Sequence, residues 1–221
     1  MASLMDPHWE CVPPMLKKVF ITIGRYPLAR RFYLAGGTAL ALQLGHRTSV
    51  DLDFFSPEDE LLDESRAEIV SALQESFTFD LLTDTIGNLH LSIQGSIVGF
   101  MGYGYRLLAP TIELEGVALA GLLDIGLMKL DALVGRGARK DFYDLYFLSR
   151  HIPLDELLEQ GQRKYSHIRD FGMMALTALA KFDIADHQVP VETRSSLAWD
   201  EVKAYFTGEI RRIGHRWFEE Q

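Results

Sequence analysis

A glycine pair and a carboxylate pair, separated by a short helix-forming segment, constrain this chain more than any other feature. The two motifs are Gly36-Gly37-Thr38 and Asp51-Leu52-Asp53-Phe54-Phe55. The aspartates alternate with apolar residues, which is typical of a strand that has one buried face, so both carboxylates point to the same side. Two neighbouring carboxylates repel each other unless a cation lies between them, and hard oxygen ligands favour Mg²⁺. The spacing therefore predicts metal ligation by Asp51 and Asp53, as nucleotidyl or phosphoryl transfer requires.

The glycine turn is the candidate phosphate cradle. Gly36 and Gly37 let backbone N–H groups at a helix N-terminus approach a triphosphate closely. The alternative is an ordinary strand–helix turn that needs a positive φ. The carboxylate pair at this spacing favours phosphate binding. Thr38 could bond a phosphate oxygen, cap the following helix, or do both, and Arg47 could hold a phosphate bidentately or form an ion pair with a nearby carboxylate.

A second group of charged residues lies further along the chain. Lys129 has apolar neighbours at helical spacing, and a partly buried lysine needs a partner. That partner is either the triphosphate or Asp141, and a purely structural salt bridge between two helices is the alternative. Asp144 follows one helical turn after Asp141 and is the second candidate. Arg139 and Lys140 should keep Asp141 ionised.

Two blocks of sequence resemble the nucleotidyltransferase superfamily of DNA polymerase β and, within it, the AbiEii/AbiGii toxin family. The resemblance covers roughly residues 30–150. The blocks are Gly36-Gly37-Thr38-Ala39-Leu40, His46-Arg47, Ser49 and Asp51-Leu52-Asp53-Phe54-Phe55, then Met128-Lys129-Leu130, Ala132-Leu133, Arg136-Gly137, Arg139-Lys140-Asp141-Phe142 and Asp144-Leu145-Tyr146. The resemblance implies Mg²⁺ as cofactor and an active site that includes Lys129 and Asp141. It also implies an acceptor such as the 3′ end of a tRNA, and a helix-turn-helix antitoxin as partner.

The fold implied by the resemblance is an α/β (α+β) core with a small mixed sheet, followed by a helical region. We expect the core at 1–115 and a helical region at 116–221 that completes the active site. The expected strands are 32–35, 50–55, 77–82, 89–93, 97–103 and a short one within 104–116. The expected helices are 13–23, 38–44, 58–76, 118–135, 139–150, 154–165, 170–181 and 198–219, with a loop at 183–195.

One element of the superfamily pattern is missing. Polymerase-type enzymes carry a third carboxylate on a later strand, near the acceptor hydroxyl, where it can act as a general base. The best strand for it, 97–101, contains no acid. Asp80, Glu113 and Glu115 are possible substitutes, and Asp141 is the best-matched candidate for the general base. Alternatively, the reaction needs no base, because a loose phosphoryl transition state depends mainly on positioning. Four histidines show no metal-ligand spacing and are interpreted as incidental: His8, His90, His151 and His167.

Composition fits a soluble cytoplasmic protein. The single cysteine, Cys11, excludes an intrachain disulfide, and no run of eighteen apolar residues occurs. Residues 51–85 carry eleven Asp and Glu against one Arg, so the acidity is local to the predicted metal site. Basic clusters at 136–140 and 211–216 could bind RNA phosphates, or they are solvated helix ends.

We therefore expect a Mg²⁺-dependent nucleotidyltransferase that transfers NMP from an NTP to an acceptor hydroxyl, in a toxin–antitoxin or phage abortive-infection pair. Two alternatives remain open. One is a small-molecule nucleotidyltransferase or a kinase that uses the same cradle. The other is a nucleotide-binding or interaction protein that kept the fold and lost catalysis, which the missing third acid would permit.

Overall fold

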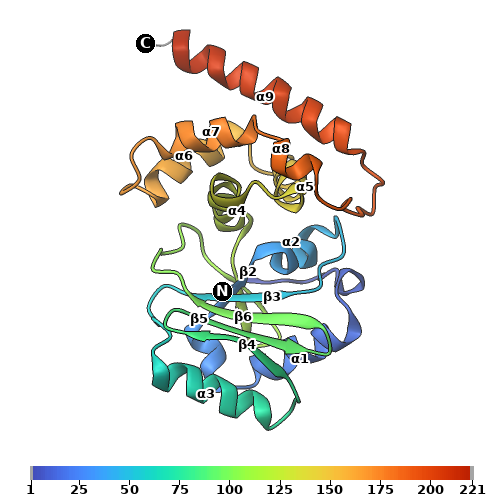
Figure 1. The fold of residues 1–221 in the computed structure, drawn as a ribbon, viewed down its shortest axis with the longest axis vertical. Helices are drawn as coiled ribbons and strands as arrows, with labels where there is room; N and C mark the ends of the chain where they lie inside the picture. Colours follow the sequence, from blue (N-terminus) through green and yellow to red (C-terminus); the bar gives the residue numbers. More distant parts are fainter. Residues whose placement is uncertain (1, 220–221) are drawn as a thin grey trace. The chain divides into compact units, whose positions relative to one another are not determined.

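The computed structural model describes residues 2–219 and divides into two compact units, Met1–Gly121 and Leu122–Gln221 (Figure 1). The first unit contains the sheet and the second is helical. The division falls later than the predicted boundary at 115, because residues 112–119 form two further strands of the sheet.

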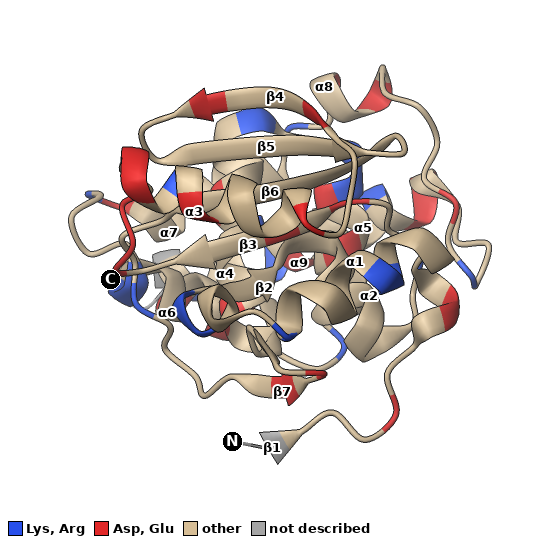
Figure 2. Cartoon of the chain, turned by 90° about the horizontal axis from the view of Figure 1, so that it is seen from below, with Lys and Arg blue, Asp and Glu red and all other residues tan. Residues whose placement is uncertain are grey.

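The first unit is built on a mixed eight-stranded sheet with the order β1-β7-β8-β2-β3-β6-β5-β4. The strands are β1 (Ala2–Ser3), β2 (Tyr33–Ala35), β3 (Leu52–Ser56), β4 (Asp80–Thr85), β5 (Asn88–Ile93), β6 (Ser96–Gly102), β7 (Ile112–Leu114) and β8 (Val117–Leu119). The central strand β3 pairs antiparallel with β2 and parallel with β6. Figure 2 shows β3, β6, β5 and β4 side by side in this order.

Strand β3 has one apolar face and one polar face. Leu52 and Phe54 are fully buried on one side, and Phe54 stacks on Phe100 of β6 with ring centroids 5.0 Å apart. Asp53 lies on the opposite side and is half-buried. Because strand side chains alternate, burial of the apolar face fixes the register and directs the carboxylates to the other face.

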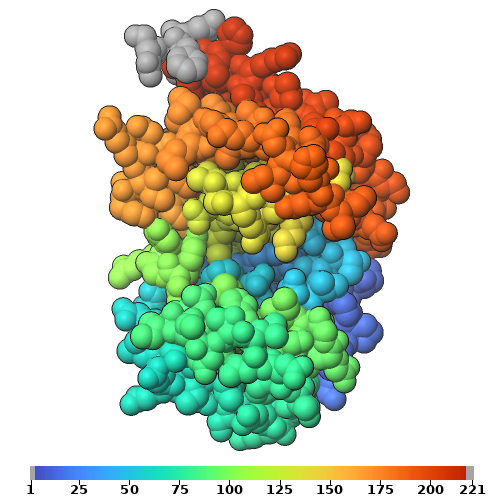
Figure 3. Space-filling model, viewed as in Figure 1, coloured from blue at the N-terminus to red at the C-terminus, as the bar shows by residue number. Residues whose placement is uncertain are grey.

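The helices of the first unit are α1 (Pro14–Gly24), α2 (Gly36–Leu44) and α3 (Asp63–Gln74), with 3₁₀ turns at Trp9–Cys11 and Pro27–Arg31. Figure 1 shows α2 and α3 on opposite sides of the sheet. Helix α1 buries Leu16, Val19, Phe20 and Ile23, the spacing of one helical face. At the sheet edge, β4 leaves Leu81 about half exposed, and this blue-green segment is visible on the surface in Figure 3.

The second unit contains α4 (Leu122–Arg136), α5 (Arg139–Leu148), α6 (Leu154–Lys164), α7 (Phe171–Leu179), α8 (Asp183–Asp186) and α9 (Trp199–Glu219). Its core includes an aromatic cluster around Phe142, whose ring centroid lies 5.5 Å from that of Trp199 and 5.6 Å from that of Phe206. Among the described residues, no helix has the length and hydropathy that a membrane span requires.

Several predicted boundaries are wrong, and among them is the strand expected at 77–82, which is β4 at Asp80–Thr85. Residues 117–119 form β8 rather than the start of a helix. Helix α3 begins at Asp63 and not at 58, because the side chains of Ser56 and Asp59 accept hydrogen bonds from the backbone of residues 58–61 and hold them in a loop. The expected loop at 183–195 begins with the short helix α8.

Candidate functional site

The two predicted metal ligands lie at the start of β3. Asp51 directly precedes the strand, and Asp53 is its second residue. Both side chains are half-buried. The backbone N–H of Ile97 on the neighbouring strand donates to Asp51 Oδ1 at 3.3 Å, which helps to orient that carboxylate. The alternation of β3 places Asp53 on its polar face, and the presentation of both carboxylates on that face stays a prediction.

The glycine turn lies directly against these carboxylates. Helix α2 begins at Gly36, which has φ +69°. The preceding residue, Ala35 of β2, pairs with Asp53 of β3. A Cβ placed at Gly36 would lie 2.8 Å from Asp53 Oδ2, closer than real Cβ contacts allow. Glycine is thus required here both by the backbone angle and by the approach of the carboxylate. The N-terminus of α2 and the carboxylate strand form one site.

Arg47 lies on the other side of the same turn. A Cβ at Gly37 would lie 2.5 Å from Nη2 of Arg47, so the guanidinium packs directly over the glycine backbone. Arg47 is 7% exposed, and its Nη1 donates to the carbonyl of Thr48 at 3.0 Å. The predicted phosphate-binding residues Gly36, Gly37 and Arg47 are therefore brought together in the first unit.

Thr38 plays a different part from the cap that the sequence suggested. The N-cap of α2 is Ala35 and has no side-chain cap, so the capping prediction is wrong. Thr38 is 1% exposed, its hydroxyl donates to the carbonyl of Asp51, and it lies 2.9 Å from Oγ of Ser49. A hydroxyl has one proton, so Ser49 must donate to Thr38 if both bonds form. Thr38 ties the first turn of α2 to the residue that begins the carboxylate strand.

The carboxylate pair suits a divalent cation whose other ligands come from a bound substrate. Asp51 and Asp53 offer hard oxygen donors, the kind of ligand that Mg²⁺ prefers. Within residues 2–219 no group of three or more His, Cys, Asp or Glu is close enough to hold a metal ion. The remaining ligands would have to be phosphate oxygens and water, which is the usual arrangement for Mg²⁺ in nucleotide sites.

None of the three sheet acids considered for the third carboxylate, Asp80, Glu113 and Glu115, lies on a strand next to β3. The neighbours of β3 are β2 and β6, and the residue of β6 in register with Asp53 is Gly99. Asp80 lies in β4, which β5 and β6 separate from β3. Glu113 lies in β7 and Glu115 in the turn after it, on the far side of β2 and β8. The sheet therefore places no acid where a polymerase-type third carboxylate would be.

Lys129 forms a buried ion-pair cluster in the helical unit. Its Nζ lies 2.8 Å from Asp141 Oδ1 and 2.6 Å from Asp144 Oδ2. Arg136 Nε adds a contact with Asp141 Oδ2 at 2.8 Å. Lys129 is 5% exposed and both aspartates are fully buried. The cluster joins α4 to α5, and the predicted catalytic roles of Lys129 and Asp141 stay predictions.

Asp141 is held ionised by neighbours other than those predicted. Burial raises the pKa of Asp141, but the charge of Lys129 and the hydrogen bond and charge of Arg136 outweigh it, and the pKa is lowered. Arg139 and Lys140, which the sequence suggested, are not the cause. A carboxylate with a lowered pKa is a weak base, so a role as general base would require a change in these ion pairs.

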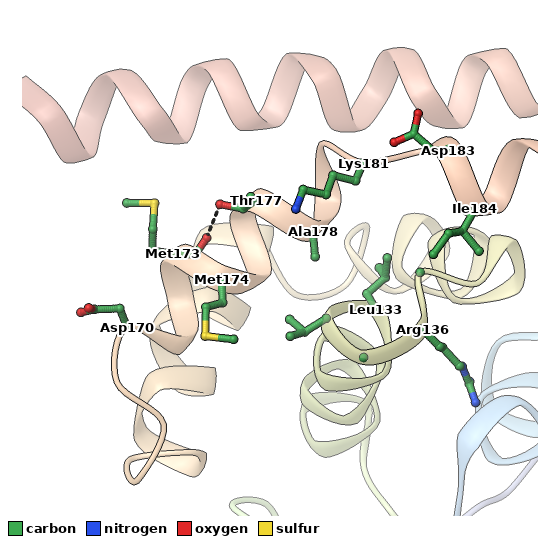
Figure 4. Close-up of a pocket in the computed structure, with 13 residues that line it drawn as sticks. Leu133, Arg136, Asp170, Met173, Met174, Thr177, Ala178, Lys181, Asp183 and Ile184 are labelled. Carbon is green, nitrogen blue, oxygen red and sulfur yellow. Dashed lines mark hydrogen bonds between the residues drawn. The ribbon is translucent and has the colours of Figure 1, made fainter.

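A separate pocket of about 490 Å³ lies within the helical unit (Figure 4). The end of α4, together with α7 and α8, lines it, and the side chains drawn there include Leu133, Met174 and Ile184. The hydroxyl of Thr177 donates to the carbonyl of Met173 within α7. None of the predicted site residues lines this pocket.

Comparisons with known proteins define the class. The family model described as "Nucleotidyl transferase AbiEii toxin, Type IV TA system" matches residues 20–118. An uncharacterized protein of Aquifex aeolicus is 35% identical over 201 residues, which are 89% of this chain and 92% of the relative. The structure of JHP933 from Helicobacter pylori shares 15% identity and a TM-score of 0.53, over 96% of this chain and 93% of that chain. A second H. pylori structure has 14% identity and a TM-score of 0.52, over 97% and 96%.

The fold is that of the polymerase β-like nucleotidyltransferases. Residues 20–118 match the AbiEii nucleotidyltransferase toxin family, and the activity that this match supports is nucleotidyl transfer. The family match covers the glycine turn and the carboxylate strand, and it ends before α4.

Proposed function

We propose that this protein transfers a nucleoside monophosphate from an NTP to an acceptor hydroxyl, with Mg²⁺ held by Asp51 and Asp53. The observation that carries the proposal is the contact of the glycine turn with the carboxylate strand, where Asp53 Oδ2 lies 2.8 Å from the position of a Gly36 Cβ. Bound Mg²⁺ would neutralise charge on the triphosphate and on the transition state. The N–H groups at the start of α2 and the guanidinium of Arg47 would hold the phosphates.

In this proposal the chain's own residues mainly position the substrate. The acceptor oxygen bonds to the α-phosphorus in line with the leaving group, and pyrophosphate departs. A loose transition state gains most from fixed geometry and compensated charge, which a rigid turn and a central strand supply. Lys129 would add positive charge to the triphosphate only by exchanging one of its two carboxylate contacts, and this role remains a prediction.

The 3′ end of a tRNA is the proposed acceptor, and a helix-turn-helix antitoxin is the proposed partner. The match to a toxin family supports an antitoxin partner in general terms, since a toxin of this kind has a cognate antitoxin. A role in abortive phage infection belongs to the same proposal.

The proposal is tested by incubating the purified chain with Mg²⁺, total tRNA and each NTP, labelled in turn at the α- and γ-phosphate. Label from the α-position on tRNA is expected, and label from the γ-position would instead indicate a kinase. Asp53→Asn should abolish transfer. Asp80→Asn, on the edge strand of the same sheet, is the matched control and should transfer normally.

Oxidation of the tRNA 3′-terminal diol with periodate tests the acceptor. Loss of labelling with oxidised tRNA would support the 3′ end, and unchanged labelling would exclude it. If no NTP and no acceptor gave transfer while Mg²⁺-dependent NTP binding persisted, the inert nucleotide-binding alternative would replace the proposal.

A further inference from the structure

A row of register-paired residues connects the carboxylate strand to a histidine. Asp53 of β3 is in register with Gly99 of β6, and Gly99 is in register with His90 of β5. Paired residues on adjacent strands direct their side chains to the same face of a sheet. His90 therefore lies on the face that carries Asp53, two strands away from it.

The missing side chain at Gly99 leaves room for the ring of His90. A Cβ at Gly99 would lie 2.9 Å from Cδ2 of His90 and 3.0 Å from its Nε2. The imidazole thus occupies the space that a side chain at Gly99 would fill, and Gly99 is the residue in register with Asp53. Gly99 lies within residues 97–101, the strand on which the superfamily pattern leads us to expect the third acid.

The imidazole of His90 is not committed to another role in the fold. Its ring makes no hydrogen bond or ion pair with any residue in 2–219, and it is half-buried. By contrast, its strand neighbours Leu89 and Leu91 are fully buried on the opposite face and supply the packing of β5. A neutral imidazole has one acceptor nitrogen, which can take a hydrogen bond from a hydroxyl group.

We infer that His90 takes the place of the third acid and contacts the acceptor hydroxyl in the transfer reaction. The inference rests on the proposed function. The hydroxyl donates to the free nitrogen of His90, which aligns the oxygen with the α-phosphorus. As that oxygen bonds to the phosphorus, the bond to the β-phosphate bridging oxygen breaks and pyrophosphate leaves with its electrons. The hydroxyl proton passes to the imidazole and then to water.

Two substitutions at His90 test the contact. His90→Ala should lower kcat about 100-fold, a typical loss for a group that takes a proton in the transition state. Mg²⁺-dependent NTP binding should stay within twofold of wild type, because His90 faces the acceptor. His90→Gln keeps an acceptor near the Nε2 position and should recover part of the activity. Thr83→Val, in register with His90 on the outer strand β4, is the matched control and should transfer normally.

A rescue experiment separates this role from simple gap filling. In His90→Ala the space above Gly99 is open, so Gly99→Asp in the same chain would place a carboxylate in register with Asp53. The double variant should transfer at least tenfold faster than His90→Ala alone. Gly99→Ala alone should displace the ring and resemble His90→Ala, and the two effects should not add.

The outcomes distinguish a failure of the proposed His90 role from a failure of the proposed nucleotidyl transfer. If wild type transfers, Asp53→Asn does not and His90→Ala transfers at the wild-type rate, the inference is wrong and the function stands. A fall in melting temperature for His90→Ala with normal kcat would likewise show that the ring only fills space. If wild type transfers nothing under any condition tested, both the proposed function and the inference fail.

Discussion

The first and second units each contain a pair of nearby aspartates, but the two pairs are built differently. Asp51 and Asp53 are half-buried at the start of a strand, beside a glycine turn. Asp141 and Asp144 are fully buried on one helix, and Lys129 lies within 2.8 Å of each. A buried carboxylate needs an internal cation, whereas a half-exposed pair can take its cation from solution.

The difference indicates which contribution each pair makes. Breaking the buried cluster leaves an uncompensated charge in the core, so its substitution should cost stability. Neutralising one carboxylate on β3 relieves repulsion and should cost activity instead. The comparison is therefore tested by measuring stability and activity on the same variants.

The largest effect is expected at the strand. Asp51→Asn or Asp53→Asn should lower nucleotidyl transfer by at least about 10³-fold, since a bound metal supplies several kcal/mol of transition-state stabilisation. The melting temperature should stay the same or rise slightly, because close like charges are removed. Transfer assays and calorimetry on each variant provide the measurement. Transfer at the wild-type rate by both variants would show that metal binding by Asp51 and Asp53 is not part of the mechanism.

The second effect is on the stability of the helical unit. Lys129→Met should lower the free energy of unfolding by about 3–5 kcal/mol, because it removes the cation that Asp141 and Asp144 share. Lys140→Met, an exposed lysine on the same helix as these aspartates, should change it by less than about 0.5 kcal/mol. Denaturant titration measures both.

The same variants also test the predicted catalytic role of Lys129. Activity is measured per folded molecule, at a temperature where Lys129→Met is still native. Unchanged activity would leave the lysine a structural residue. A loss larger than the unfolded fraction explains would support its predicted contact with the triphosphate.

The pH dependence of stability gives a smaller effect. The folded pKa of Asp141 is lowered, despite burial, by Lys129 and Arg136. A carboxylate with a lowered folded pKa contributes stability that is present above its unfolded pKa of about 3.9 and is lost as the pH falls through the folded value. Unfolding free energies measured from pH 7 down to acid should therefore decrease below about pH 4 in wild type. The decrease should be shallower in Asp141→Asn.

The acid dependence of the Asp141→Asn variant should not vanish. Burial raises the pKa of Asp155, but Arg212, a backbone hydrogen bond and Arg216 outweigh it, so this pKa is lowered too. Asp155 continues to titrate in the variant. An unchanged acid slope in Asp141→Asn would mean that the buried cluster contributes nothing to acid unfolding.

The sequence predicted the elements that local patterns determine. The alternation around Asp53 identified the carboxylate strand, and the turn at Gln94–Gly95, where both residues have positive φ, identified the hairpin of β5 and β6. The need of a buried cation for a partner makes Asp141 one of two candidate partners of Lys129, and the structure contains that ion pair.

The sequence could not supply the features that depend on which strands become neighbours. The apolar run predicts a helix from residue 118, because short apolar runs fit either period. The turn at Glu115–Gly116, with φ of 50° and 80°, instead makes residues 117–119 a hairpin strand. The row of Asp53, Gly99 and His90 requires the order β3-β6-β5 and its register. In the sequence, only the alternation of Leu89, His90 and Leu91 indicates that the His90 side chain lies on the polar face of its strand.

The smallest effect is expected at Thr38, which positions the carboxylate site without a charge. Thr38→Val keeps the shape but removes the hydrogen bond to the Asp51 carbonyl and the contact with Ser49. It should cost about 1 kcal/mol of stability, the usual net value of one hydrogen bond. Thr38→Ser keeps the hydroxyl and should retain most of that stability.

The consequence for binding should exceed the consequence for folding. Thr38 connects the start of α2 to the residue before β3, so its loss loosens the glycine turn relative to Asp51. We expect KM for the Mg²⁺–NTP complex to rise about threefold to tenfold in Thr38→Val, because imperfect positioning weakens ground-state contacts. An unchanged KM with the expected loss of stability would show that the turn is held by other contacts. In that case the close approach of Gly36 to Asp53 and of Gly37 to Arg47 would be enough to keep the site in place.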